Sequence, residues 1–195
     1  MGDDKQFIHG HAIVEAGASI GNRTHVWAFA HILDGAVIGD DCNICDHTFI
    51  EGNVILGDRV TVKCGVYLWD GITVEDDVFI GPAAVFTNDL KPRSKQYPRE
   101  FSKTLLKKGC SIGANSTILA GNVVGEWSLV GAGSVVTKDV PNHAAIWGNP
   151  AKFKYWVCFC SEKIAFGNSD RFACKCGRGF EFDRITNTVT CTFDV

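Results

Sequence analysis

A bulky apolar residue recurs at every sixth position through the first half of the chain. The run has fourteen consecutive members: Ile8, Val14, Ile20, Val26, Ile32, Ile38, Ile44, Ile50, Leu56, Val62, Leu68, Val74, Ile80 and Phe86. Because 46% of the residues are apolar, chance would give such a run in one phase with a probability of about 2 × 10⁻⁵. Neither an α-helix, with a period of about 3.6, nor an isolated strand, with a period of about two, repeats every six residues.

A small or β-branched residue usually precedes each bulky one by two positions, as at Ala30 and Cys42. Such pairs predict a coil of short parallel strands, in which both residues point inward and fill a narrow triangular core. Glycine recurs every 18 positions just after a bulky residue, at Gly21, Gly39 and Gly57. This spacing predicts three hexads in each coil. We expect these glycines to let the backbone turn without a Cβ penalty, and the coils to stack about 4.8 Å apart.

The hexads predict one coiled domain over residues 1–140 with a loop inserted at 87–111, because the bulky run resumes at Ile112. The inserted segment is rich in lysine and arginine and contains Pro92 and Pro98. A long loop inside a compact domain is uncommon unless it has a function. A tolerated insertion is the alternative.

Proline ends the regular pattern at Pro141, which leaves a predicted connection at 141–157 and a cysteine-rich appendage at 158–195. The appendage resembles a zinc ribbon, in which four thiolates hold a tetrahedral structural zinc and fold a piece too small for its own core. Its pairs have one intervening residue instead of the usual two, and Cys191 is an alternative ligand. The predicted ligands are Cys158, Cys160, Cys174 and Cys176.

The composition excludes several classes of partner. A net charge of −3 with 21% charged residues fits a globular protein with no general attraction to nucleic acid. No run approaches the roughly 20 apolar residues that cross a membrane, and Met1–Gln6 lacks the basic and apolar regions of a secretory signal. We therefore expect a cytoplasmic protein without a membrane partner, in which a disulfide framework for the nine cysteines is disfavoured.

Residues 18 apart are expected to stack at one corner of the triangular coil. Asn88 then stacks above Asp70, whereas His47 falls at a different corner, so one subunit does not bring Asn88 and His47 together. A site that uses both requires a second subunit, as in a trimer. The face that leads to Asn88 carries an exposed stripe that includes Tyr67 and Trp69. Either subunit packing or a stacked nucleobase would cover such a stripe.

Several longer motifs are more specific than the hexad. They are Cys-Asp-His-Thr-Phe-Ile-Glu at 45–51, Leu-Trp-Asp-Gly at 68–71, Glu-Asp-Asp-Val-Phe-Ile-Gly-Pro at 75–82, Phe-Thr-Asn-Asp at 86–89, Pro-Arg-Ser-Lys-Gln-Tyr-Pro at 92–98 and Gly-Asn-Pro-Ala at 148–151. Over roughly residues 8–152 the chain resembles the hexapeptide-repeat N-acetyltransferases of dTDP-3-amino-3,6-dideoxyhexoses. It also resembles the related enzymes that acetylate the 3-amino group of UDP-2-acetamido-3-amino-glucuronate.

The resemblance implies a left-handed parallel β-helix, although parallel crossovers are normally right-handed. It also implies a homotrimer with active sites between subunits, acetyl-CoA as donor, and a dTDP- or UDP-linked 3-amino sugar of surface-glycan biosynthesis as acceptor. Asn88 matches the family asparagine that contacts the sugar amine, and His47 occupies a substrate-site position. The accompanying substrate-binding candidates are Tyr67, Trp69, Asp70 and Asp89.

The implied chemistry needs no nucleophilic side chain, because a thioester is already activated. The protein must hold a neutral amine about 3–3.5 Å from the thioester carbonyl and stabilise the oxyanion that forms. Either His47 accepts the proton of the sugar ammonium, or the leaving thiolate takes a proton late while His47 and Asn88 position the amine.

Small residues stack at one turn of the second half of the coil. Gly113, Ala114, Gly131 and Ala132 would leave backbone groups accessible to the pantetheine arm of coenzyme A, and Lys138 completes the cofactor-binding candidates. Turns also favour small residues for structural reasons alone, which is the competing explanation.

Other functions compete with acetyl transfer. A zinc-dependent hydratase would need three converging imidazoles, but no histidine stacks 18 residues from another. A non-catalytic scaffold would explain the core but not the basic loop or the Asn88-Asp89 motif. An acyltransferase with a different acyl donor or acceptor follows the same logic as acetyl transfer.

Overall fold

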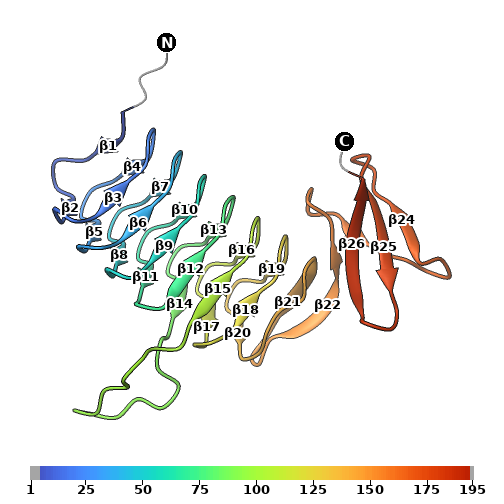
Figure 1. Cartoon of the computed structure of the whole chain (residues 1–195). Helices are drawn as coiled ribbons and strands as arrows, with labels where there is room; N and C mark the ends of the chain where they lie inside the picture. Colours follow the sequence, from blue (N-terminus) through green and yellow to red (C-terminus); the bar gives the residue numbers. More distant parts are fainter. Residues whose placement is uncertain (1–4, 194–195) are drawn as a thin grey trace.

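A computed structural model describes residues 5–193. Within that range the chain forms β-strands and no helices. Figure 1 shows the strands wound into a long coil, with β1 at one end and a separate small sheet beyond the other. Three sheets run along the coil, and we call them sheets A, B and C. Within residues 5–193 no helix is long and apolar enough to cross a membrane.

The strands of the coil follow one another in the order A, B, C. Sheet A contains β1 (Phe7–Ile8), β4 (His25–Val26), β7 (Asn43–Ile44), β10 (Thr61–Val62), β13 (Phe79–Ile80), β16 (Ser111–Ile112), β19 (Leu129–Val130), β21 (Ala144–Trp147), β22 (Lys152–Val157) and β23 (Lys163–Ile164). Sheet B contains β2 (Ile13–Val14), β5 (His31–Ile32), β8 (Phe49–Ile50), β11 (Tyr67–Leu68), β14 (Val85–Phe86), β17 (Thr117–Ile118) and β20 (Val135–Val136). Sheet C contains β3 (Ser19–Ile20), β6 (Val37–Ile38), β9 (Ile55–Leu56), β12 (Ile72–Val74), β15 (Thr104–Leu106) and β18 (Val123–Val124).

Parallel pairing with a register of 18 residues confirms three hexads in each coil, as in Phe7 opposite His25 and His31 opposite Phe49. From β4 onward, the second residue of each two-residue strand is buried in the core, and Ile32 and Ile44 are fully buried. The smaller residue two positions earlier is buried as well, as at Ala30. A parallel β-helix of this kind therefore has one continuous apolar core along its axis.

Most corners of the coil use a left-handed backbone conformation at the third residue after the bulky one, including Phe29 (φ 61°) and His47 (φ 58°). The stacked glycines do not: none of Gly21, Gly39 and Gly57 has a positive φ. A Cβ on Gly39 would lie 2.5 Å from the carbonyl oxygen of Gly57. The expected reason for these glycines was therefore wrong, because close stacking of the coils requires them.

The inserted loop differs from the predicted segment 87–111. Strand β15 pairs with β12 and β18 in sheet C, and Leu106 is fully buried in the core. Across the insertion, paired residues are 32 apart instead of 18, as in Ile72 opposite Thr104, so the insertion adds 14 residues to one coil. Leu106 continues the hexads, but the two lysines after it made this strand resemble loop.

The segment 141–157 is more than the connection that we predicted. Strand β21 pairs in parallel with β19, and β22 and β23 add to sheet A as antiparallel strands. Beyond them, β24 (Arg171–Ala173), β25 (Gly179–Asp183) and β26 (Thr188–Phe193) form the separate antiparallel sheet. The hexad pattern gave no signal for β22 and β23, because antiparallel strands are not bound to its period.

Candidate functional site

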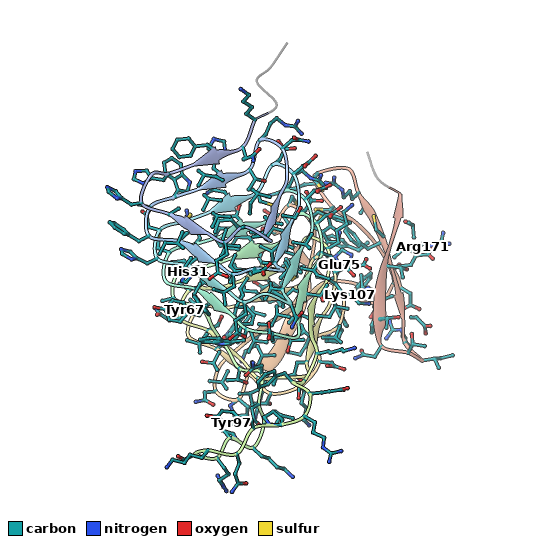
Figure 2. The ribbon with its side chains drawn as sticks, turned by 60° about the vertical axis from the view of Figure 1, so that its left-hand side comes forward. His31, Tyr67, Glu75, Tyr97, Lys107 and Arg171 are labelled. Carbon is teal, nitrogen blue, oxygen red and sulfur yellow. The ribbon has the colours of Figure 1, made fainter. Side chains whose placement is uncertain are left out.

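An aromatic stripe runs along the outer face of sheet B. His31, Phe49, Tyr67 and Val85 lie in register on successive coils, and Figure 2 shows His31 and Tyr67 on the same side of the molecule. The Phe49 ring centroid lies 5.6 Å from that of Trp69 and 6.2 Å from that of Tyr67. Because 49% of the Tyr67 surface is exposed, this face offers rings to a partner or a ligand.

These rings border a hollow of about 410 Å³, a size typical of small-ligand sites, which are roughly 300–1,000 Å³. The indole of Trp69 donates to the Phe86 carbonyl at 3.0 Å, which fixes the ring at the edge of the hollow. The structure therefore brings three of the predicted site residues together. The lining residues are Phe29, His31, His47, Thr48, Phe49, Tyr67 and Trp69.

His47 lies at the corner between sheets A and B, which we call the A–B corner. Its ring stacks on that of Phe29 at 5.0 Å, and Phe29 stacks on His11 at 5.7 Å. The next residue of this column is Gly65, and a Cβ added there would meet no atom of residues 5–193 within 4 Å, so the column ends in open space. The column was missed in the sequence because its two histidines are 36 residues apart, but Phe29 at the intervening 18-residue step would have revealed it.

Asn88 lies between β14 and β15, at the corner between sheets B and C. The predicted separation of Asn88 and His47 at different corners is thus confirmed. The Asn88 carbonyl accepts from the backbone N–H of Ser102 at 3.0 Å. Its side-chain amide has no hydrogen-bond partner among the described residues, so this amide is available to a ligand.

The two aspartates that we predicted near the substrate accept hydrogen bonds from backbone N–H groups. An oxygen of Asp70 accepts from the N–H of Asn53 at 2.9 Å, and the Asp70 N–H donates to Glu51 at 2.6 Å. Asp89 accepts from the N–H of Lys91 at 2.7 Å and shapes the start of the inserted loop. Each carboxylate has a second oxygen, so these bonds are compatible with a ligand contact.

A pair that the sequence did not reveal lies at the edge of the hollow. Nε2 of His31 lies 3.3 Å from a carboxylate oxygen of Glu15, and the other oxygen accepts from the N–H of Asp34 at 2.9 Å. The Asp34 hydrogen bond, followed by the one to His31, lowers the pKa of Glu15. The pair was missed because Glu15 and His31 are 16 residues apart, outside the 18-residue register.

The small residues of the second half of the coil divide into two groups. Gly113 and Gly131 are needed for stacking, since a Cβ would lie 2.4 Å from the Ala132 nitrogen and 2.8 Å from the Trp147 Cβ, respectively. Ala114 and Ala132 lie at the A–B corner, and no acceptor for their backbone N–H groups occurs among residues 5–193. Those two N–H groups can therefore serve a ligand. Lys138 is exposed just after β20.

The four predicted metal ligands converge. The sulfurs of Cys158, Cys160, Cys174 and Cys176 all lie within 4.8 Å of one another, and residues 5–193 contain no disulfide. Two of the S–S separations are 3.5 Å. Zinc–sulfur bonds of about 2.3 Å place the sulfurs of a tetrahedron roughly 3.8 Å apart. The cluster fits a tetrahedral metal, and Cys191 is not part of it.

The comparisons with known proteins agree with this architecture. A family model for the bacterial transferase hexapeptide (six repeats) matches residues 17–52, and a model for the hexapeptide repeat of succinyl-transferase matches residues 108–138. The dTDP-3-amino-3,6-dideoxy-alpha-D-galactopyranose 3-N-acetyltransferase of Aneurinibacillus thermoaerophilus is 56% identical over 176 residues, which is 90% of this chain and 91% of that protein.

Two solved structures share the fold. A hexapeptide-repeat acetyltransferase from Vibrio cholerae, complexed with acetyl coenzyme A, matches with a TM-score of 0.55 and 28% identity over 63% of this chain and 70% of that one. A putative acetyltransferase from Bacillus cereus matches with a TM-score of 0.52 and 26% identity over 80% of each chain. The fold is the all-β, left-handed parallel β-helix that the hexads and the resemblance predicted.

Proposed function

Because the chain belongs to the hexapeptide-repeat nucleotide-sugar N-acetyltransferases, we propose that it transfers the acetyl group of acetyl-CoA to the 3-amino group of a dTDP- or UDP-linked 3-amino sugar. The observation that carries this proposal is the hollow on sheet B, where His47, Tyr67 and Trp69 converge. Exposed rings suit the flat faces of a nucleobase or a sugar. The Aneurinibacillus relative acts on a dTDP-linked sugar by its name, which favours dTDP over UDP.

The donor side of the site is the A–B corner of the later coils. The backbone N–H groups of Ala114 and Ala132 can donate to the amide carbonyls of a pantetheine arm, since nothing within the described chain accepts from them. Lys138 supplies a cation for a phosphate of the coenzyme. The stacking glycines Gly113 and Gly131 keep this corner narrow.

The site is completed by a neighbouring subunit in a homotrimer. His47 and Asn88 lie on opposite edges of the sheet B face, so one subunit presents them in different directions. A trimer brings the Asn88 edge and the projecting loop of one subunit against the A–B corner of the next. This arrangement also covers the exposed rings of sheet B, which would otherwise face water.

The reaction forms a C–N bond as the amine attacks the thioester carbonyl, and it breaks the C–S bond to release the thiolate of coenzyme A. The side-chain amide of Asn88 holds the amine in place for attack. The amine's surplus proton passes to the departing thiolate, either directly or through the His47 imidazole. Backbone N–H groups at the corner are the candidates for stabilising the oxyanion.

The cysteine cluster adds a structural zinc to this proposal, with no part in the chemistry. Four thiolates in tetrahedral arrangement suit zinc, and the backbone N–H of Arg178 lowers the pKa of the Cys176 thiol to about 6. A reducing compartment is consistent with nine cysteines that form no disulfide within the described chain. We therefore place the protein in the cytoplasm.

The test is an incubation of the purified protein with acetyl-CoA and a panel of dTDP- and UDP-linked 3-amino and 4-amino sugars, with free thiol as the readout. Thiol release with a 3-amino sugar and a product heavier by one acetyl group would support the proposal. Release with a 4-amino sugar alone would contradict the proposed position. Coenzyme A binding without turnover would contradict the acceptor, and no binding at all would favour a scaffold.

A further inference from the structure

We propose that the four cysteines form a zinc cross-link that ties the end of the β-helix to the separate sheet β24–β26. Cys158 and Cys160 lie in the turn between β22 and β23, whose strands extend sheet A. Cys174 and Cys176 lie in the turn between β24 and β25. The inference rests on the zinc assignment proposed above, but it gives the metal a specific structural role, because each half of the site belongs to a different sheet.

The two turns have the same backbone geometry, which explains how pairs with one intervening residue can bind a metal. In each turn the fourth residue has a left-handed φ, 68° at Ser161 and 96° at Gly177. Its N–H donates to the carbonyl of the first cysteine at 2.9 Å, and the N–H of that cysteine donates to the carbonyl of the fifth residue at 2.8 Å. Each pair is therefore presented by the same hydrogen-bonded turn, and the four sulfurs converge.

Side chains of the second turn also contact the first turn. Arg178 lies over the ring of Phe159, with 4.7 Å from the guanidinium carbon to the centroid, and Lys175 forms an ion pair with Glu162. The Phe159 ring centroid also lies 4.5 Å from that of Trp127, which is at a corner of the coil. The residue between the first two ligands is thus held between the β-helix and the second turn.

Apart from the cysteines, side-chain packing and not strand pairing joins the described residues of the two parts. Within residues 5–193, no strand of β24–β26 pairs with sheet A, and the chain between β23 and β24 is mostly exposed. The remaining contacts are apolar. Phe180 and Val189 are buried in the same core cluster as the coil residues, and ring centroids lie 5.3 Å apart for Phe180 and His143 and 5.9 Å apart for Trp156 and Phe182. Segments shorter than about 40 residues seldom fold without a metal, a disulfide or a partner. The zinc therefore holds the small sheet in place.

The test measures zinc content and hydrogen exchange on the full-length protein. We expect about one zinc per chain. Removal of the metal by a chelator, with thiols kept reduced, should raise amide exchange in β24–β26 by at least about tenfold. Exchange in the coil strands β7, β8 and β16–β20 should stay unchanged. The double replacements Cys158→Ser/Cys160→Ser and Cys174→Ser/Cys176→Ser should each lose zinc and reproduce this pattern, because a cross-link needs both halves.

Replacement of a cysteine outside the cluster, Cys64→Ser or Cys191→Ser, is the matched control and should keep zinc and protection. A metal-free wild-type protein, or iron in place of zinc, would overturn the proposal. Unchanged protection of β24–β26 after zinc removal, or loss of protection along the whole coil, would overturn it as well. Acetyl transfer by the same samples separates the two ideas: zinc-loaded protein that fails to transfer acetyl contradicts only the proposed reaction.

Discussion

Successive coils make different kinds of contact at two corners of the β-helix. At the corner between sheets C and A, the C–A corner, charged side chains from successive coils pair with one another. At the A–B corner, rings stack with their faces partly exposed, and backbone N–H groups at Ala114 and Ala132 have no acceptor among the described residues. Polar groups that bind one another, as at the C–A corner, are not left to bind a ligand. The A–B corner leaves rings and N–H groups that a ligand or a neighbouring subunit would contact.

The C–A corner is a ladder of polar contacts. The N–H of Asn22 donates to Asp40 at 2.7 Å, that of Asp40 to Asp58 at 2.9 Å, and that of Asp58 to Asp76 at 3.0 Å. Beside this ladder, Arg23 pairs with Asp41 at 2.7 Å and Arg59 with Asp77 at 2.6 Å. The aspartates of each coil thus accept hydrogen bonds from backbone N–H groups of the coil before it. We expect this corner to govern stability and the rest of the surface to govern function.

The largest expected effect comes from two asparagines at equivalent hexad positions on different corners. Asn88→Ala should lower kcat/KM by at least about 10²-fold, because misplacing a reactant by 1 Å costs roughly that much. Asn22→Ala at the C–A corner should leave kcat/KM near the wild-type value. Steady-state kinetics of the two variants provide the measurement. An Asn88→Ala enzyme with full activity would remove Asn88 from the site.

A smaller effect is expected from the stripe on sheet B. Tyr67→Ala should raise the KM for the nucleotide sugar about 5- to 150-fold, because stacking of a base on an aromatic ring contributes roughly 1–3 kcal/mol. Val37→Ala, an exposed strand residue of sheet C, is the matched control and should change little. If Tyr67→Ala alters the oligomeric state and not KM, the stripe is a packing surface.

The C–A ladder should respond in stability and not in activity. Asp58→Ala leaves the Asp40 N–H without its acceptor and removes a charge near Arg59, which should cost about 1–2 kcal/mol in the free energy of unfolding. Urea unfolding with an unchanged m-value would measure the loss. Reduced kcat with unchanged stability would contradict the division between the corners.

The smallest effect is a dependence on acid. Hydrogen bonds from Arg23 and Arg59 lower the pKa values of Asp41 and Asp77 below the usual 3.8. A carboxyl group whose pKa is lowered in the folded state stabilises the fold at pH values above its usual pKa. This stabilisation is lost as the pH falls through the lowered pKa. The midpoint temperature of thermal unfolding should therefore decrease as the pH is lowered below about 4. Asp41→Asn should flatten this fall, and an equally steep fall in that variant would argue against the ladder as its source.

The sequence predicted the core and the register because inward residues repeat with the period of the coil. It missed what does not share that period. Glu15 and His31 meet across coils at a spacing of 16 residues, and β22 and β23 pair as antiparallel strands. The convergence of the four cysteines was predicted from their spacing, but the assignment of the two pairs to different sheets requires the topology. The ligand-facing role of His47 and Asn88 stays a prediction, since it depends on a neighbouring subunit.

The most direct test of the account mixes two impaired subunits. His47→Ala and Asn88→Ala chains would be denatured, mixed and refolded together, and acetyl transfer by the mixed assemblies compared with that of each variant alone. If each site takes His47 from one subunit and Asn88 from the next, random assembly restores about one quarter of the sites. Activity near one quarter of the wild-type value is the predicted result. Activity no higher than that of either variant alone would contradict a site shared between subunits.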